Sequence, residues 1–194
     1  MAEARMPAVK RTFDVAAACI LATLLAVPLL IVAVAVRLTS AGPVLYWSDR
    51  VGQHNRIFRM PKFRTMRTET PVLATHLLQD PGSYLTPIGS LLRRLSLDEV
   101  PQLWSILKGD MSFVGPRPAL FNQGDLIQLR TDAGVHALVP GLTGWAQING
   151  RDEIPIPAKV ALDAEYLHRV SLGMDLSILW RTAGQALMGS GVSH

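Results

Sequence analysis

At residues 96–103 the chain reads Ser-Leu-Asp-Glu-Val-Pro-Gln-Leu, which sets two adjacent carboxylates, Asp98 and Glu99, at the start of a short apolar helix. Two arginines, Arg93 and Arg94, lie just before this stretch, and Arg117 follows it between two prolines. Carboxylates accompanied by arginines are typical of a site that handles phosphate and a metal ion. The stretch therefore predicts an anion-handling site.

Local spacing also allows the two carboxylates an ordinary structural role. Ser96 followed three residues later by Glu99 fits a capping box, in which the serine oxygen accepts a hydrogen bond from the Glu99 amide and the glutamate reaches back to the Ser96 amide. Pro101 makes the register ambiguous, because proline is tolerated only near a helix start, so Asp98 is an alternative cap. Spacing alone leaves both roles open.

Length and hydropathy indicate one domain with a membrane-associated segment. The chain has 194 residues, 49% of them hydrophobic, and its mean hydropathy of +0.25 is high for a soluble domain. The run from Val15 to Val36 contains no charged residue, and it is long enough to cross a hydrocarbon core of ~30 Å. A cleaved signal peptide has a shorter apolar region, roughly 7–15 residues. We therefore expect the segment to stay in the mature protein.

Pro28 divides this apolar run into two arms, neither of which is long enough to cross the core alone. Because a proline inside a helix kinks it, two interpretations stay open: a kinked spanning helix, or a re-entrant hairpin that enters and leaves by the same face. Lys10 and Arg11 precede the run, and Arg37 and Arg50 follow it. Lys and Arg mark the cytoplasmic side, so this pattern favours the hairpin.

Positive charge is concentrated after the anchor. Residues 50–67 contain six Lys or Arg and no acid, which fits a solvated face, attraction to anionic headgroups or binding of a phosphorylated ligand. No nucleic-acid motif accompanies the patch, so we expect no nucleic-acid partner. If the stretch is extended, Lys62 and Arg64 lie on one side and could reach a common ligand. Neither face is cleanly apolar, so a regular half-buried strand is not expected there.

Apolar spacing and end signals predict a mostly helical α/β domain. We expect helices at residues 72–79, 86–95 with Thr86 as cap, 98–109, 121–129, 158–170 and 175–188 with Asp175 as cap, a strand at 44–47 and a loop at 110–118. Arg93 lies opposite the apolar stripe of its helix and is expected to face outward. The last helix is nearly uncharged and carries Trp180, which favours the core or a membrane interface.

Residues 140–151 read as turn, short strand, turn. In an extended backbone, Gln147, Asn149 and Arg151 would share one side, where they could bind a nucleotide or sugar. A structural hairpin with these polar residues facing water is the alternative. Cys19 is the only cysteine, so no disulfide within the chain and no cysteine metal site is expected.

Five segments, taken in order, resemble one family. They are residues 10–14 (Lys-Arg-Thr-Phe-Asp), 62–66 (Lys-Phe-Arg-Thr-Met), 96–99 (Ser-Leu-Asp-Glu), 108–118 (Lys-Gly-Asp-Met-Ser-Phe-Val-Gly-Pro-Arg-Pro) and 140–151. Together they resemble the bacterial sugar transferases, and more narrowly the small monotopic phosphoglycosyl transferases. The similarity extends from about residue 10 to residue 188, without the N-terminal membrane bundle that larger members carry.

The resemblance implies a fold and a reaction. The fold would be a monotopic membrane protein, with a re-entrant anchor at residues 1–39 broken near Pro28 and a compact cytoplasmic catalytic domain at residues 40–194 with amphipathic interfacial helices. The reaction would move a sugar-1-phosphate from a UDP-sugar to a polyprenol phosphate and release UMP. It would occur at the inner leaflet of the bacterial cytoplasmic membrane, as the first membrane step of surface glycan assembly. Family members often have a polar residue before the break-point proline, where this chain has Val27.

The resemblance also implies residue roles. Asp98 would attack the β-phosphorus and form a covalent phosphosugar intermediate, and Glu99 would be the neighbouring acid or base that assists the polyprenol phosphate. Because a carboxylate must approach an anionic diphosphate, Mg²⁺ is expected, with Asp98 as a ligand. Further candidates for binding phosphate or nucleotide are Lys62, Arg64, Arg93, Arg117, Gln147, Asn149 and Arg151.

Two rival interpretations make different predictions. In the first, the chain is a single-pass membrane-anchored interaction protein whose basic segment binds lipid or a partner, and Asp98 and Glu99 only cap a helix. In the second, it is a degenerate relative that acts as an assembly factor, which the intact Asp98, Glu99, Arg93 and Arg117 argue against. The first rival predicts that Asp98→Asn leaves function intact, whereas the transferase predicts that it abolishes UMP release.

Overall fold

The computed structural model describes residues 8–71, 80–150 and 154–187. The helix expected at residues 72–79 and the candidate Arg151 lie outside these residues. In chain order the elements are α1 (Ala8–Leu24), α2 (Ala26–Thr39), β1 (Leu45–Val51), η1 (Gln53–Asn55), β2 (Ile57–Phe63), η3 (Pro81–Tyr84), α3 (Gly89–Arg94), η4 (Leu97–Gln102), α4 (Leu103–Lys108), β3 (Ser112–Val114), α5 (Gly124–Asp132), η5 (Val135–Ala137), β4 (Gly141–Thr143), α6 (Trp145–Gly150), α7 (Ile156–Arg169) and α8 (Leu172–Leu187). The mostly helical α/β class is confirmed.

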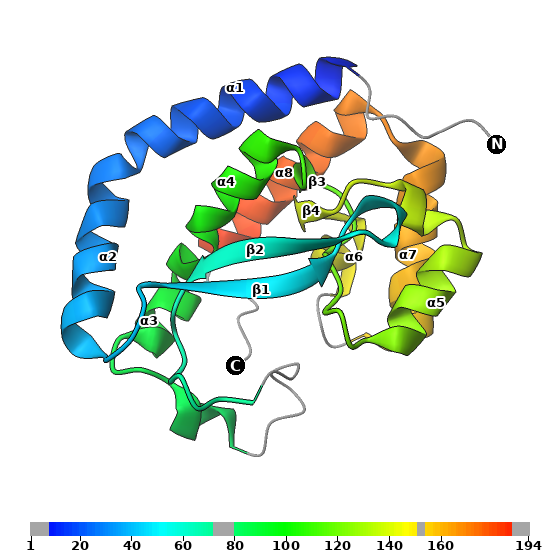
Figure 1. Cartoon of the computed structure of the whole chain (residues 1–194). Helices are drawn as coiled ribbons and strands as arrows, with labels where there is room; N and C mark the ends of the chain where they lie inside the picture. Colours follow the sequence, from blue (N-terminus) through cyan, green and yellow to red (C-terminus); the bar gives the residue numbers. More distant parts are fainter. Residues whose placement is uncertain (1–7, 72–79, 151–153, 188–194) are drawn as a thin grey trace.

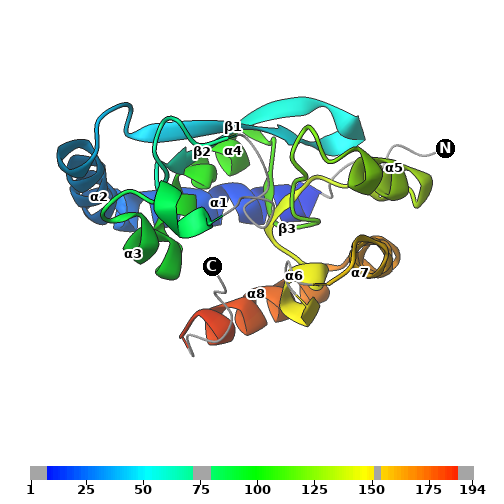
Figure 2. The ribbon, with the colours of Figure 1, turned by 90° about the horizontal axis from the view of Figure 1, so that it is seen from below.

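The elements form three layers. Figure 1 shows α1 and α2 as an angled pair along one edge of the molecule, with the β1–β2 ribbon crossing the centre. Seen from below, the ribbon forms one face, α1 and α4 lie behind it, and α6, α7 and α8 form the opposite face (Figure 2). The main core lies between these layers, and its largest fully buried side chains include Ile106, Met111, Val114 and Ile178.

The apolar N-terminal run consists of α1 and α2, which meet at an angle of 63°. Because Pro28 has no amide hydrogen and its ring clashes with the carbonyl four residues earlier, the helix breaks at Leu25 and Pro28 lies in the first turn of α2. On either side the backbone bonds continue, with Leu25 N donating to Leu21 O at 2.9 Å and Leu29 N to Leu25 O at 2.8 Å. Across the described residues, no single helix has the length and apolar composition to cross a membrane, while the bent pair meets that test jointly.

Strand β2 is regular, although no regular half-buried strand was expected within residues 50–67. It pairs antiparallel with β1 along its whole length, placing Tyr46 opposite Lys62 and Trp47 opposite Pro61. Consecutive residues Met60 and Pro61 are both buried, because this part of the strand is covered on both faces. A strand covered on both faces shows no alternation of apolar and polar residues, so the pattern could not reveal it.

The C-terminal half differs from the expectation in two places. Residues 112–114, expected as loop, form β3 and pair in parallel with β4. The expected extended stretch ends at Gly144, where a side chain would come within 2.1 Å of the Gly115 carbonyl oxygen. After that close approach the chain turns into α6, whose residues Gln147 and Asn149 are helical and not extended.

Helix boundaries follow contacts that local signals did not identify. Thr86 does not cap α3, because its hydroxyl donates to the Thr65 carbonyl at 3.3 Å. Asp175 does not cap α8, because Ser171 Oγ accepts the Met174 amide at 3.2 Å instead. The helix expected at 121–129 is displaced to Gly124–Asp132, whereas α7 confirms the one expected at 158–170. Gly109, with φ 93°, ends α4 as predicted.

Candidate active site

The carboxylate pair lies on η4, a 3₁₀ turn between α3 and α4. Ser96 precedes it with φ 54° and ψ 20°, a left-handed conformation that reverses the chain after α3, and its side chain makes no capping hydrogen bond. The capping box is therefore not formed, and that structural interpretation of Glu99 is wrong. Pro101 is accommodated within the 3₁₀ turn.

Glu99 is held by two cations from different elements. Its Oε1 accepts hydrogen bonds from Lys62 Nζ of β2 at 2.6 Å and from Arg117 Nη2, in the segment after β3, at 2.9 Å. Burial by itself would raise the pKa of Glu99, but the charges of Arg117 and Lys62 outweigh it and hold that pKa well below its usual range. The two cations thus favour the ionised form of Glu99.

Asp98 is in the opposite situation. It is 8% exposed, and within the described residues no other side chain donates a hydrogen bond to its carboxylate. Burial raises the pKa of Asp98, Lys62 and Arg93 act against that rise, and the adjacent Glu99 adds to it. A buried carboxylate with open oxygen atoms is available to act as a nucleophile or to bind a cation.

Arg93 faces this site, so the expectation that it faces outward is wrong. Its Nε donates to Thr65 Oγ1 at 3.0 Å, and its positive charge acts on both carboxylates. The reason lies in the orientation of α3, which buries Leu92 but leaves Leu91 and Leu95 more than half exposed. The apolar stripe of this short helix is therefore only partly buried.

Three of the sequence candidates do not lie with this cluster, and a fourth falls outside the described residues. Arg64 is buried, and its guanidinium donates to the carbonyls of Ser40 and Ala41, where the chain leaves α2. Gln147 and Asn149 lie on α6, where Asn149 Nδ2 donates to Trp145 O at 2.8 Å. Arg151 is outside the described residues. The structure thus brings together Asp98, Glu99, Lys62, Arg93 and Arg117.

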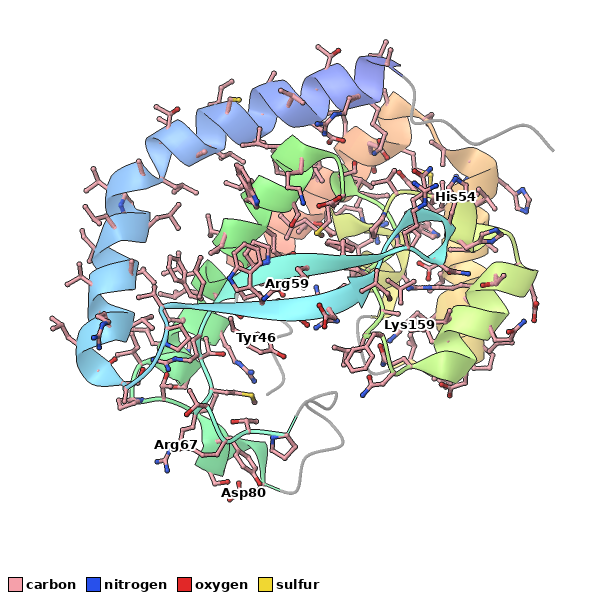
Figure 3. All side chains as sticks on the ribbon, in the orientation of Figure 1. Tyr46, His54, Arg59, Arg67, Asp80 and Lys159 are labelled. Atoms are coloured by element: carbon pink, nitrogen blue, oxygen red, sulfur yellow. The ribbon has the colours of Figure 1, made fainter. Side chains whose placement is uncertain are left out.

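Sequence reasoning missed an aromatic residue beside the cluster. Tyr46 is the cross-strand partner of Lys62, and residues directly opposite one another share a face of the ribbon. Its side chain is partly exposed, and Figure 3 labels it at the β1–β2 ribbon. The sequence signal was present, because residues 44–47 were predicted as a strand, but its partner strand was not.

It also missed a buried ion pair behind Arg117. Arg130 of α5 donates through Nε and Nη2 to Asp163 Oδ2 of α7, at 3.0 and 2.6 Å. Its Nη1 donates to the carbonyl oxygen of Arg117 at 2.7 Å. The two residues are 33 positions apart, and no local pattern links them.

The donor set permits one kind of metal site. Among the described residues, no group of three or more His, Cys, Asp or Glu side chains could hold a metal ion. Mg²⁺ is commonly bound by one or two carboxylates together with substrate phosphates and water. The open, buried carboxylate of Asp98 fits such a shared site and would not fit a cage built from protein ligands alone.

A carboxylate pair surrounded by a lysine and two arginines lies on the same chain as a bent apolar helix pair, and such a charge pattern is typical of sites for phosphate compounds. The sequence profile of the bacterial sugar transferases matches residues 5–189. The chain belongs to this family, which confirms the resemblance.

Individual relatives cover this chain almost completely. The uncharacterized sugar transferase EpsL of Bacillus subtilis is 42% identical over 187 residues, which are 95% of this chain and 90% of that protein. The undecaprenyl-phosphate glucose phosphotransferase of Komagataeibacter xylinus is 41% identical over 184 residues, 89% of this chain but 35% of that protein. An N-acetylgalactosaminephosphotransferase of Aeromonas hydrophila, which acts on undecaprenyl phosphate according to its name, is 35% identical over 94% of this chain and 44% of its own length.

Proposed function

We propose that the chain transfers a sugar-1-phosphate from a UDP-sugar to a polyprenol phosphate, releasing UMP and giving a polyprenyl-diphosphate-linked sugar. The names of its relatives support the chemical class, since they include phosphotransferases of undecaprenyl phosphate. The observation that carries the proposal is the buried, open carboxylate of Asp98 beside Lys62 and Arg93. This first membrane-bound product would enter surface glycan assembly.

Asp98 acts as the nucleophile in a two-step displacement. Its carboxylate attacks the β-phosphorus of the donor, the bond from that phosphorus to the bridging oxygen breaks, and UMP leaves. An oxygen of the polyprenol phosphate then attacks the same phosphorus and restores the carboxylate. The positive charges of Arg93, Lys62 and Arg117 surround the site at which charge accumulates on the phosphoryl oxygens.

Glu99 assists the second step. Because its pKa is held low, it remains an anion that orients Lys62 and Arg117 toward the phosphoryl group, and the two cations that it orients lower the repulsion met by the incoming phosphate. Asp98 is the residue that would hold Mg²⁺ together with the diphosphate. The chemistry which that ion supplies when bound is neutralisation of phosphate charge. Chelation should therefore stop UMP release, and added Mg²⁺ should restore it.

The bent pair α1–α2 forms a re-entrant anchor in the cytoplasmic leaflet of the bacterial inner membrane. Its outward side chains are large and apolar, and those more than 60% exposed include Leu24, Val27, Leu30, Ile31 and Leu38. Side chains of both helices project away from the body of the protein in Figure 3. Trp180 of α8 is 83% exposed, which suits a helix lying at the membrane interface. The site would then be accessible to one soluble substrate and one lipid substrate.

The test is the intact mass of the purified chain after incubation with Mg²⁺ and UDP-sugars, without polyprenol phosphate. The donors are UDP-glucose, UDP-galactose and UDP-N-acetylgalactosamine. These sugars occur in the names of the relatives described above and of the undecaprenyl-phosphate galactose phosphotransferase of Salmonella typhimurium. We expect a phosphosugar adduct on the wild-type chain and none on Asp98→Asn. An adduct that persists in Asp98→Asn would show that Asp98 is not the nucleophile. No UMP release from any donor, with polyprenol phosphate present, would refute the transferase.

A further inference from the structure

The segment that carries Arg117 is fixed through its backbone carbonyl groups. Four successive carbonyl oxygens each accept a hydrogen bond: Pro116 O from Gly141 N at 2.9 Å, Arg117 O from Arg130 Nη1 at 2.7 Å, Pro118 O from Arg50 Nη1 at 3.1 Å and Ala119 O from Val51 N at 2.9 Å. The donors come from β4, α5 and β1. Three separate elements thus converge on one short segment.

The flanking prolines explain why carbonyl groups are used. Pro116 and Pro118 have no amide hydrogen, so the segment cannot be anchored by donating at either position. At these two positions only the carbonyl acceptors are available, and an acceptor needs a donor brought from elsewhere. At Pro118 and Arg117 itself that donor is an arginine side chain, from Arg50 and Arg130 respectively.

We propose that Arg130 is a positioning residue for Arg117, and that Asp163 fixes Arg130 for this task; the proposal rests on the transferase function above. Asp163 is 1% exposed and Arg130 is 8% exposed. Asp163 binds the Nε and Nη2 edge of the guanidinium, which leaves Nη1 directed at the Arg117 carbonyl. A pair that only joined α5 to α7 would not need this third contact.

The arrangement forms a continuous connection from the back of the domain to the site. Asp163 orients Arg130, Arg130 holds the backbone of Arg117, and the Arg117 side chain binds Glu99. The hydrogen bond to its carbonyl fixes the backbone of Arg117, and with it the point from which the flexible side chain reaches Glu99. Because a displacement of about 1 Å in a catalytic group can cost about 100-fold in rate, the connection acts on turnover and not on donor affinity.

The experiment compares the full chain with three variants. Arg130→Lys keeps the charge beside Asp163 but cannot reach both Asp163 and the Arg117 carbonyl. Arg130→Met with Asp163→Leu removes the pair without leaving a buried unpaired charge, which guards against loss of folding. Arg169→Met is the matched control, an exposed arginine on the same helix as Asp163. UMP release gives kcat and the donor KM, and deuterium uptake is followed in the peptide spanning residues 111–123.

We expect Arg130→Lys and the double variant to lose about tenfold or more in kcat, with the donor KM changed by less than about threefold, and to take up more deuterium in that peptide. In an Arg117→Met background, Arg130→Lys should cost less than about twofold, because residues that act through one another are not additive. The control should match wild type throughout.

Two results would overturn the proposal. One is an Arg130→Lys variant equal to wild type in kcat and in uptake; the other is a loss equally large in the Arg117→Met background, which would make the role of Arg130 merely structural. If the wild-type chain released no UMP at all, the transferase function would fail, and deuterium uptake would decide separately whether Arg130 holds the segment. In that case, unchanged deuterium uptake in Arg130→Lys and in the double variant would refute the proposal that Arg130 holds the segment.

Discussion

Two groups of buried charges in this fold are satisfied to different degrees. In the first, Lys10 of α1 binds Asp175 of α8, and the other carboxylate oxygen of Asp175 accepts the Tyr166 hydroxyl at 2.6 Å. In the second, Glu99 is held by two cations while the neighbouring carboxylate of Asp98 receives no side-chain hydrogen bond from the described residues. The same residue types thus make a closed network in one place and an open one in the other.

The difference separates an anchor from a reaction site. The closed network joins residues 165 positions apart and ties the first helix to the last, so its value lies in stability. The open network leaves a carboxylate buried with its charged form disfavoured, which costs free energy unless something else binds there. Substitution in the open network should therefore lower activity and can raise stability, whereas substitution in the closed network should lower stability and leave activity unchanged.

Asp98→Asn should give the largest effect. Removal of a nucleophile costs roughly four or more orders of magnitude in turnover, so UMP release should disappear. Because burial raises the pKa of Asp98, a neutral side chain of equal size should also make the protein more stable against thermal unfolding in detergent. An Asp98→Asn chain that is inactive but less stable than wild type would place Asp98 with the closed network instead.

Glu99→Gln should come next. It keeps the shape but removes the anion between Lys62 and Arg117, so both cations lose their common partner and are no longer held toward the phosphoryl group. We expect UMP release to fall by about 100-fold, with the phosphosugar adduct of Asp98 still formed in the absence of polyprenol phosphate. Adduct mass and UMP release are measured on the same preparation. Unchanged release would remove Glu99 from the mechanism.

Asp175→Asn should affect stability alone. Breaking a buried ion pair by removing one partner costs about 3–5 kcal/mol, and the unfolding midpoint in detergent should fall accordingly. The rate of UMP release per folded molecule should stay at the wild-type value, because Lys10 and Tyr166 do not contact the open network. Lys10→Met combined with Asp175→Asn is the control, and it should recover most of the stability because no buried cation is left unpaired and the asparagine oxygen can still accept the Tyr166 hydroxyl. A tenfold loss of rate in folded Asp175→Asn would show that the two networks are coupled.

The open network could be predicted well from the sequence, and the closed one could not. Asp98, Glu99 and Arg117 stand in compact motifs, so their residue types mark them as candidates and the family resemblance assigns their roles, although spacing alone leaves a capping role open for the two carboxylates. Lys10 and Asp175 come from opposite ends of the chain, and pairing at that separation leaves no local pattern. Arg64 shows the related difficulty: a basic residue in a basic segment is typical of a phosphate ligand, yet its partners are the carbonyl groups at the end of α2.

Backbone geometry was the other limit. The extended interpretation of Gln147 and Asn149 relied on alternation, but the close approach of Gly144 to Gly115 ends β4 and starts α6. Such an approach depends on how β3 and β4 pair, which the local sequence does not encode. In the same way Ser96 matched a capping pattern, although its conformation is left-handed and its side chain caps nothing.

Ser96→Gly should give the smallest effect, and its sign distinguishes the two interpretations of the carboxylate pair. If Ser96 were the cap of a helix containing Asp98 and Glu99, the substitution would lower stability by a few tenths of a kcal/mol, and Ser96→Ala would lower it by about 1 kcal/mol. At φ 54° a left-handed serine costs about 1 kcal/mol relative to glycine, and its side chain contributes no capping bond. Ser96→Gly should therefore raise the free energy of unfolding by about 0.5–1 kcal/mol, whereas Ser96→Ala should not lose the stability of a cap. Urea unfolding in detergent measures the free energy of unfolding of both variants. A Ser96→Gly chain less stable than wild type would restore capping as the reason that the two carboxylates stand where they do.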